Sequence, residues 1–436
     1  MTLQPKMEMV LKKCSAVFGR GRKRNEAEDA CDAKDEYMIR NGALLLQMQI
    51  SSGHGKGSTS EPIRSFSARE IKEATNNYDH RLILGRNICT GYRGTLEDGR
   101  VVAVKSPRGL HPNGQDIDYF LNQVVIKQII NHKNVAKLHG CCLETRVPTL
   151  VYEFLPNFTL FDQIHGRDGS NSIAAFNIPW SKLVKIAAET SHALSYMHMA
   201  LAKPIIHMDV KPSNIYLDES FTAKLTNFGF SVSISPGEDF ISQIAVGTFA
   251  YMDPDYCITL RVTEKCDVYS FGVTLMELLT GKNPMVFVEQ CSHLVDYFVW
   301  HMQQNQVLGI VHPRVLREAA TEETLAFARL AVRCAARRGE ERPTMREVAI
   351  ELRQIHHAAK RRCSIALGRI ELRPWLGLCN YAIVREQLII KQVISSLFSR
   401  VKCWPQCVVA SRDKPIRLMW ESSQPYNPFG IYWCDI

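Results

Sequence analysis

The sequence predicts an α+β fold in which a sheet-rich part precedes a larger helical part. Between Phe66 and Pro156 the apolar residues form short runs with the composition and spacing of strands. After Pro156 they recur with helical periodicity over long segments. Strands first and helices afterwards is an order typical of α+β domains.

The sheet-rich part is expected to contain five strands and one helix, after a short helical stretch. That stretch, Ala68–Asn76, follows Ser67, whose side chain suits an N-cap. The dipeptide Asp98-Gly99 between two strand-like runs predicts a hairpin turn. The helix is expected at Asp116–Ile130, and the strands at Leu82–Leu84, Tyr92–Leu96, Val101–Lys105, Val135–Leu143 and Thr149–Phe154.

The helical part is expected to have long helices near residues 181–202, 264–280, 322–336 and 344–358. The predicted domain therefore covers residues 66–358. Its first lobe is placed at 66–155 and its second lobe at 156–358.

Residues 1–64 are interpreted as an extension that includes a Gly/Ser-rich linker, Ser51–Glu61. Its basic start suits contact with anionic lipid, and Cys14 suits palmitoylation. We favour a solvated tail without stable structure, because the linker cannot bury enough apolar surface to fold alone.

Residues 359–436 are broken by prolines, and only Tyr381–Val401 has an amphipathic pattern. That pattern suits a helix that contacts a partner or a membrane surface. A poorly ordered tail and an error in the gene model are the alternatives. The domain is expected to fold without the chain beyond Lys360.

The composition is that of a soluble globular protein, with 46% hydrophobic residues, 22% charged residues and a net charge of +9. Mild basicity of this kind usually reflects a solvated surface, and we expect no nucleic-acid partner. The 14 cysteines lack zinc-site spacing, Cys403 and Cys407 being the nearest candidates. Since the sequence shows no secretory signal, we expect reduced thiols in a cytoplasmic protein. No apolar run approaches the ~20 residues of a membrane-spanning helix.

Four short motifs occur in order along the predicted domain. They are Val-Ala-Val-Lys ending at Lys105, His207-Met208-Asp209 followed by Asn214, Asn227-Phe228-Gly229, and Asp253-Pro254-Asp255. Their order and their expected structural contexts match the protein-kinase signature. Residues 66–358 therefore resemble protein kinases. The resemblance implies a bilobal protein-kinase fold, with a five-stranded first lobe and a mainly helical second lobe.

Other features resemble the plant receptor-like and receptor-like cytoplasmic kinases, near the wall-associated group. These features are Gly247-Thr248, Asp267–Gly272 and Glu341–Met345. Within that group the closest resemblance is to the ZED-related pseudokinases of plant immunity. It rests on Asn41–Leu46, Phe66-Ser67 and Ala74–Tyr78.

The resemblance assigns roles to the residues that keep the kinase pattern. Asp209 corresponds to the catalytic base, Lys211 to the lysine that steers phosphate, and Asn214 to a metal ligand. The lysine after the base is typical of Ser/Thr kinases rather than Tyr kinases. The nucleotide-binding positions are Lys105, Gly85, Glu153 and Phe154.

Three departures from the kinase pattern remove a charge that phosphoryl transfer uses. Asn227 replaces the carboxylate that holds Mg²⁺, and a neutral amide is a poorer ligand for a hard dication. Gln123 stands where the acidic partner of Lys105 belongs, so it can hydrogen-bond that lysine but cannot neutralise it. Met208 removes the arginine that would bind a phosphorylated activation segment.

Three further departures concern packing. Lys127 falls at an apolar position of the hydrophobic spine, where a charge is costly unless its head reaches water. Tyr216 falls where a smaller aliphatic residue floors the adenine pocket, so its ring would crowd the base. In the loop Gly85–Gly91, side chains would stand where phosphate should bind.

Together these departures predict a pseudokinase in which ATP binding is weak and Mg²⁺ binding is impaired. The resemblance implies an adaptor or decoy of plant immunity, in the cytoplasm or at the inner face of the plasma membrane. Its implied partners are a coiled-coil nucleotide-binding leucine-rich-repeat receptor, other receptor-like cytoplasmic kinases and pathogen effectors. The alternatives are a weakly active Ser/Thr kinase that uses Lys105, Asp209 and Asn214, and a non-functional gene product.

Overall fold

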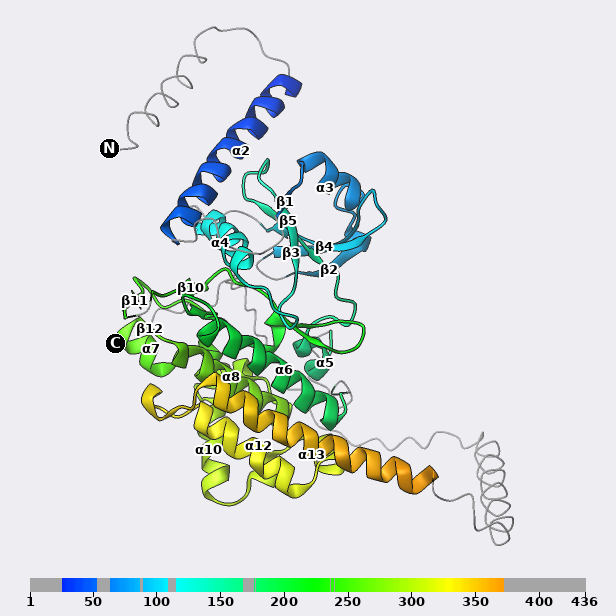
Figure 1. The fold of residues 1–436 in the computed structure, drawn as a ribbon, viewed down its shortest axis with the longest axis vertical. Helices are drawn as coiled ribbons and strands as arrows, with labels where there is room; N and C mark the ends of the chain where they lie inside the picture. Colours follow the sequence, from blue (N-terminus) through cyan, green and yellow to red (C-terminus); the bar gives the residue numbers. More distant parts are fainter. Residues whose placement is uncertain are drawn as a thin grey trace, which may run out of the picture. The chain divides into compact units, whose positions relative to one another are not determined.

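Figure 1 shows the fold of the chain as a computed structural model. The structure describes residues 26–52, 63–86, 89–108, 115–167, 176, 178–235, 237–238 and 240–371. The chain divides into two compact units, which we name the sheet unit and the helical unit. The sheet unit comprises Met1–Thr159, Tyr196–Asp209 and Asn214–Asp239, and the helical unit comprises Leu160–Ser195, Val210–Ser213 and Phe240–Ile436.

The sheet unit contains a six-stranded sheet with the strand order β1-β5-β6-β4-β3-β2. Neighbouring strands are antiparallel except β1 and β5, which are parallel. The five expected strands are confirmed, and β1 is an additional strand that is too short to give a sequence pattern. The strands are β1 (Arg64–Ser65), β2 (Ile83–Arg86), β3 (Cys89–Thr95), β4 (Val101–Pro107), β5 (Leu138–Cys142) and β6 (Thr149–Glu153).

The two faces of this sheet hold different cores because side chains alternate along a strand. Val102 and Val104 of β4 lie in a core with helix α3 (Ala68–Ala74), which Ser67 caps through a capping box with Glu70. Ala103 packs on the opposite core, with helix α4 (Gln115–Ile129). The same alternation places Lys105 on the α4 side. Shorter strands of this unit are β7 (Ile205–Ile206), β8 (Ile215–Leu217), β9 (Ala223–Leu225) and β10 (Val232–Ser233).

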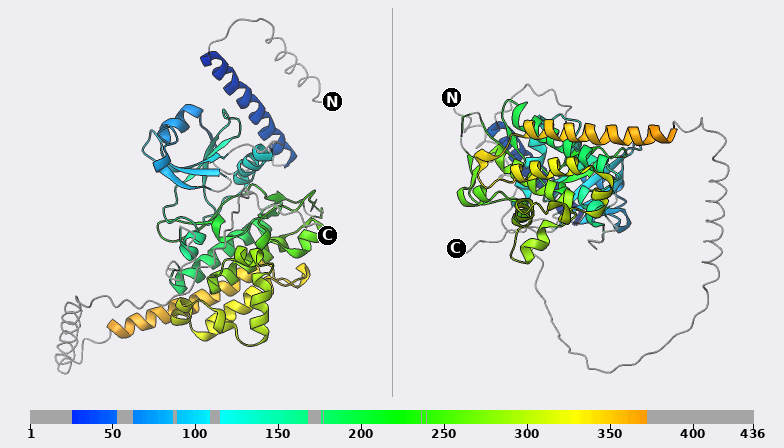
Figure 2. Two further views of the ribbon diagram at one scale, coloured as in Figure 1. Left: turned by 180° about the vertical axis from the view of Figure 1, so that it is seen from behind. Right: turned by 90° about the horizontal axis from the view of Figure 1, so that it is seen from below.

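Residues before the domain form a helix, α2 (Glu26–Ser51), which lies beside α4 in both Figure 1 and Figure 2. Leu44, Leu45 and Met48 pack against the α4-side core. Asn41 is fully buried, and its amide donates hydrogen bonds to the carbonyls of Leu143 and Thr145, both at 2.9 Å. The expectation of an unstructured tail is therefore wrong for this segment, because α2 gains its stability from tertiary packing.

The helical unit is organised around α8 (Glu264–Thr280), of which nearly every side chain is buried. Helices α10 (Leu294–Gln303) and α12 (Thr321–Cys334) pack on α8, and α13 (Met345–Glu371) packs on α12. The four expected long helices are confirmed, the first of them as α6 (Trp180–Met199). Shorter elements are α5 (Leu160–His165), α7 (Pro254–Thr259), α9 (Pro284–Glu289), α11 (Pro313–Glu318), β11 (Phe240–Ile241) and β12 (Arg261–Val262).

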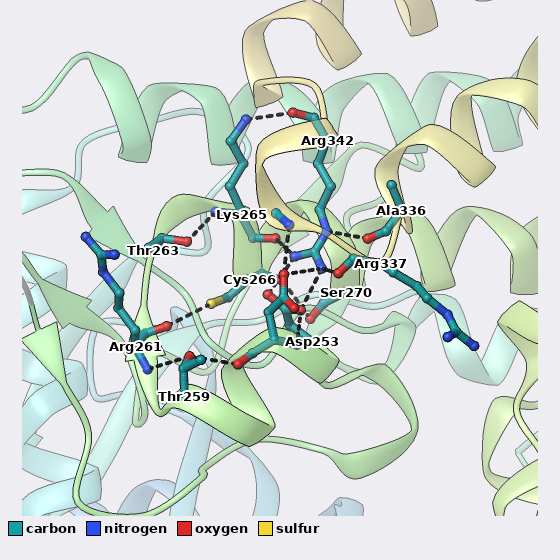
Figure 3. Close-up of polar contacts among 12 residues, drawn as sticks. Asp253, Thr259, Arg261, Thr263, Lys265, Cys266, Ser270, Ala336, Arg337 and Arg342 are labelled. Carbon is teal, nitrogen blue, oxygen red and sulfur yellow. Dashed lines mark hydrogen bonds and ion pairs between the residues drawn. The ribbon is translucent and has the colours of Figure 1, made fainter.

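A buried ion pair joins two motifs of the helical unit that are far apart in sequence. Arg342 binds Asp253 through two hydrogen bonds, of 2.6 and 2.7 Å, and its Nε donates to the carbonyl of Ala336 at 2.7 Å. Figure 3 shows the guanidinium surrounded by these acceptors and by the carbonyl of Lys265. Because both charged partners are buried and paired, loss of either would leave an uncompensated charge.

The last helix is longer than expected, because α13 continues to Glu371 rather than ending near residue 358. Ala359 is buried, and Arg362 forms an ion pair of 2.8 Å with Glu323 of α12. The amphipathic stretch Tyr381–Val401 lies outside the described residues. Among the residues that the structure describes, no helix is both long and apolar enough to cross a membrane.

Candidate active site

Hydrogen bonds to backbone carbonyls hold together two segments of the sheet unit, one that includes His207 and Asn214 and one that includes Thr226. The Nε2 atom of His207 lies 2.8 Å from the carbonyl of Thr226, and its ring meets the ring of Phe228 edge-on, with centroids 4.9 Å apart. The amide and the hydroxyl of Thr226 both donate to the carbonyl of Asn214, at 2.9 and 3.0 Å. These contacts bring the side chains of Asp209 and Asn227 next to each other.

The carboxylate of Asp209 is buried and accepts hydrogen bonds from two side-chain amides. Its Oδ2 lies 2.7 Å from Nδ2 of Asn214 and 3.3 Å from Nδ2 of Asn227. Asn227 adopts a left-handed backbone conformation with φ of +71°, which asparagine tolerates better than most residues. The side chains of Asp209 and Asn214 thus meet, but both amides present nitrogen, not oxygen, to the carboxylate.

Tyr119 of α4 occupies the other side of the Asn227 amide and donates a hydrogen bond to Oδ1. Burial raises the pKa of the Tyr119 phenol well above its usual range, so the hydroxyl keeps its proton. The orientation of the amide follows from its neighbours, because its NH₂ must face the carboxylate of Asp209. The one oxygen of Asn227 is therefore already used by a protein donor.

The same face of α4 binds the rest of this loop. The ring of Tyr119 lies so close to Gly229 that an added Cβ would be 2.1 Å from a ring carbon. Asn122, three residues on, donates to the carbonyls of Phe228 and Ser231 at 3.1 and 2.9 Å. Neither role was predicted from the sequence, although positions 119, 122 and 123 share one helix face.

Gln123 does not bind Lys105 directly. Gln123 is buried, and its Oε1 accepts a hydrogen bond of 3.0 Å from the hydroxyl of Tyr152. The ammonium of Lys105 lies 4.9 Å from the centroid of the Tyr152 ring and 5.9 Å from that of Tyr216. Burial lowers the pKa of Lys105, and the nearby Cys89 opposes part of this shift. Within the described part of the chain, no carboxylate pairs with Lys105. Two aromatic rings, rather than the acidic side chain of an active kinase, thus lie near the ammonium of Lys105.

Lys127 lies inside the core, with a side chain only 8% exposed. Its ammonium is 5.4 Å from the centroid of the Phe228 ring. Burial lowers the pKa of Lys127 to about 7, although the nearby carboxylate of Glu153 opposes the shift. The ammonium of Lys127 therefore does not reach water. Its contact with the face of the Phe228 ring and its partial loss of the proton at neutral pH reduce the cost of burying it instead.

The remaining predicted nucleotide positions have protein partners of their own. The carboxylate of Glu153 accepts from the amide of Lys137 at 2.7 Å and lies 3.5 Å from the ammonium of Lys224. The guanidinium of Arg93 lies 5.7 Å from the centroid of the Phe154 ring. Gly85 pairs with Gly91 across β2 and β3, and residues 87 and 88 between them lie outside the described residues.

Two further predicted residues are placed as follows. Met208 is buried in a left-handed conformation with φ of +68°, so the position expected to hold an arginine carries no charge. Lys211 donates to the hydroxyl of Thr248, and both residues belong to the helical unit.

The donor set of this site does not fit a magnesium ion. A magnesium ion prefers octahedral oxygen ligands, usually with one or two carboxylates. Of the three candidates only Asp209 offers a carboxylate, while the Asn214 and Asn227 amides turn their nitrogens to it. An ion bound there would have to share the single oxygen of Asn227 with the hydroxyl of Tyr119.

Residues 87–351 match the protein kinase domain family. The putative wall-associated receptor kinase-like 16 of Arabidopsis thaliana is 41% identical over 332 residues, which is 76% of this chain and 74% of that protein. The wall-associated receptor kinase-like 1 of the same plant is 40% identical over 323 residues, 73% of this chain but only 43% of that protein. The chain therefore spans less than half the length of some relatives. By these matches, and by the kinase motifs that the fold brings together, the chain belongs to the protein kinase family, among the wall-associated-kinase-like kinases.

Proposed function

We propose that this chain is a pseudokinase, which keeps the kinase fold for binding a protein partner and transfers phosphate very slowly or not at all. The observation that carries the proposal is the position of Asn227. Its amide lies between the hydroxyl of Tyr119 and the carboxylate of Asp209, where a kinase needs a carboxylate that faces the metal.

The expected loss of rate is large. Removing one preorganised electrostatic group from an active site typically costs on the order of 10²–10³ in rate. Here the metal carboxylate and the acidic partner of Lys105 are both replaced by neutral amides, at Asn227 and Gln123. Effects of residues that act together are not additive, but a kinase with a typical rate of about 1–100 s⁻¹ would lose useful turnover.

The adaptor role rests on the resemblance to the ZED-related pseudokinases. In this proposal the chain docks on a coiled-coil nucleotide-binding leucine-rich-repeat receptor and senses modified kinases or pathogen effectors, in the cytoplasm or at the inner face of the plasma membrane. Co-expression with such receptors, followed by size-exclusion chromatography, tests the partner class. The absence of a stable complex across a representative set would contradict it.

A weakly active Ser/Thr kinase is the second candidate, and two observations favour it. Asp209 and Asn214 keep their mutual hydrogen bond of 2.7 Å, and Lys105 keeps its place on β4. In this reading Asp209 would act as the base, the amide of Asn214 would face the metal, and Lys105 would contact phosphate.

Thermal denaturation of the purified full-length chain with ATP, with and without Mg²⁺, separates the two candidates. A ligand specific for the native state stabilises it by about 2.7 kcal/mol at a hundredfold excess over its dissociation constant. We expect no Mg²⁺-dependent change in melting at millimolar ATP. The matched variant combines two substitutions. Tyr119→Phe removes the hydroxyl that donates to the Asn227 side chain, and Asn227→Asp restores a carboxylate for Mg²⁺. This variant should gain a Mg²⁺-dependent shift in melting temperature. A clear shift in the unmodified chain would contradict the pseudokinase proposal.

A further inference from the structure

The helical unit contains a cavity of about 550 Å³ near the end of α8, which the kinase motifs do not use. It lies among the C-terminus of α8, helices α9 and α10, and the start of α11. Its volume is within the usual range for small-molecule pockets, roughly 300–1,000 Å³. Aromatic and aliphatic side chains form most of the wall, including Phe176, Phe287, Tyr297 and Ile310.

One wall of the cavity is a stacked aromatic pair. The rings of Phe176 and His312 lie nearly parallel, at 23°, with centroids 4.1 Å apart. Gly281 makes room for this pair, because a Cβ there would lie 3.0 Å from a carbon of the His312 ring. Gly281 also has a φ of +66°, which favours glycine at the end of α8. The cavity thus offers a flat apolar surface that an aromatic ring would fit.

His312 carries an unused hydrogen-bond donor. Its side chain is 7% exposed, and its Nδ1 accepts the amide of Arg314 at 3.2 Å, which caps α11. Burial, with Arg317 and Arg314 nearby, lowers the pKa of His312, so the neutral ring is favoured. The neutral ring then carries its proton on Nε2, and this atom has no hydrogen-bond partner among the described residues.

Charge selects the class of ligand. Lys282 is the single cationic residue among the described residues that line the cavity, and none of them is acidic. The Lys282 ammonium lies 5.7 Å from the centroid of the Tyr297 ring, which keeps the charge beside an aromatic wall. A buried donor, a cation and no carboxylate suit an anion that accepts hydrogen bonds.

We propose that this cavity binds a small aromatic carboxylate. The carboxylate accepts a hydrogen bond from Nε2 of His312 and pairs with Lys282. The aromatic body of the ligand lies against the apolar wall that includes Phe176.

The test uses the full-length chain and the probe 1-naphthoate, with 1-naphthamide as the matched neutral analogue. Saturation-transfer NMR detects contact, and isothermal calorimetry measures the dissociation constants. We expect 1-naphthoate to bind at least about fivefold more tightly than 1-naphthamide, a difference near 1 kcal/mol. No detectable binding of 1-naphthoate at about 1 mM, or equal binding of the two probes, would overturn the proposal.

Three variants locate the site. Lys282→Gln should weaken 1-naphthoate about fivefold and leave 1-naphthamide unchanged, because it removes only the charge. His312→Asn keeps an N-cap for α11 but removes the Nε2 donor, so it should weaken both probes. The control, Arg337→Gln, changes a side chain that is 91% exposed and does not line the cavity, and both affinities should stay as they are. Unchanged affinity for 1-naphthoate in a folded Lys282→Gln variant would refute the assignment even if His312→Asn does not fold.

Discussion

Replacing Lys127 with methionine is expected to stabilise the protein at neutral pH. The ordinary pKa of 10.5 falls to about 7 in the folded chain, because the side chain is 8% exposed. Each unit of this pKa shift corresponds to about 1.36 kcal/mol. Keeping this lysine charged in the core therefore costs roughly 5 kcal/mol. The folded-state pKa is the net result of all contacts of the ammonium, including the one with the Phe228 ring, whereas imperfect repacking of the methionine offsets up to about 1.5 kcal/mol of the gain. We therefore expect Lys127→Met to be about 3 kcal/mol more stable at pH 7.

The pH dependence has a definite sign. Between about pH 7 and pH 10.5 the folded chain loses the Lys127 proton while the unfolded chain keeps it. The unfolded state then binds more protons, so the contribution of Lys127 to the free energy of unfolding rises with pH across this window and is constant below it. The advantage of Lys127→Met should therefore shrink by about 1.36 kcal/mol per pH unit above pH 7.

Urea denaturation at pH 7 and pH 9, followed by circular dichroism, measures both quantities. The difference between Lys127→Met and the unmodified chain cancels the titration of groups that both proteins share. Lys72→Met is the matched control, since Lys72 is exposed on α3 and should show no such pH-dependent difference. A stability difference for Lys127→Met that is the same at both pH values would refute the burial of this charge.

Three other outcomes are expected. Asn227→Asp alone should not restore phosphoryl transfer to a generic protein substrate, because Lys105 still lacks an acidic partner; robust incorporation of labelled phosphate would show otherwise. Asn41→Ala should lower the free energy of unfolding by about 1–3 kcal/mol, since it removes the amide donor from the buried carbonyl of Leu143 and the partly buried carbonyl of Thr145, and an unchanged urea midpoint would mean that α2 is not docked. A chain that ends at Lys360 loses the ion pair of Arg362 and should melt a few degrees below one that ends at Glu371. Equal melting temperatures of the two truncated chains would show that this pair contributes nothing.

Elements with strong local signals were predictable from the sequence. The capped helix after Ser67, the hairpin at Asp98-Gly99 and the long helix α8 follow from capping, turn chemistry and periodicity, and all three are present. The juxtaposition of Asp209 and Asn214 was also predictable, because the two residues belong to one short motif. Residues close in sequence need little tertiary information to meet.

The tertiary structure decided what lies across long separations in the chain. Residues 119 and 227 are 108 positions apart, and no local pattern indicates that a tyrosine of α4 donates to the Asn227 amide. Helix α2 also lacks a strong apolar stripe, so only its docking through Asn41 reveals it as structured. The amino-acid sequence by itself determined which charges the kinase motifs have lost. Only the fold decided which neighbours fill the space those charges leave, because burial and hydrogen-bond partners depend on contacts between distant segments.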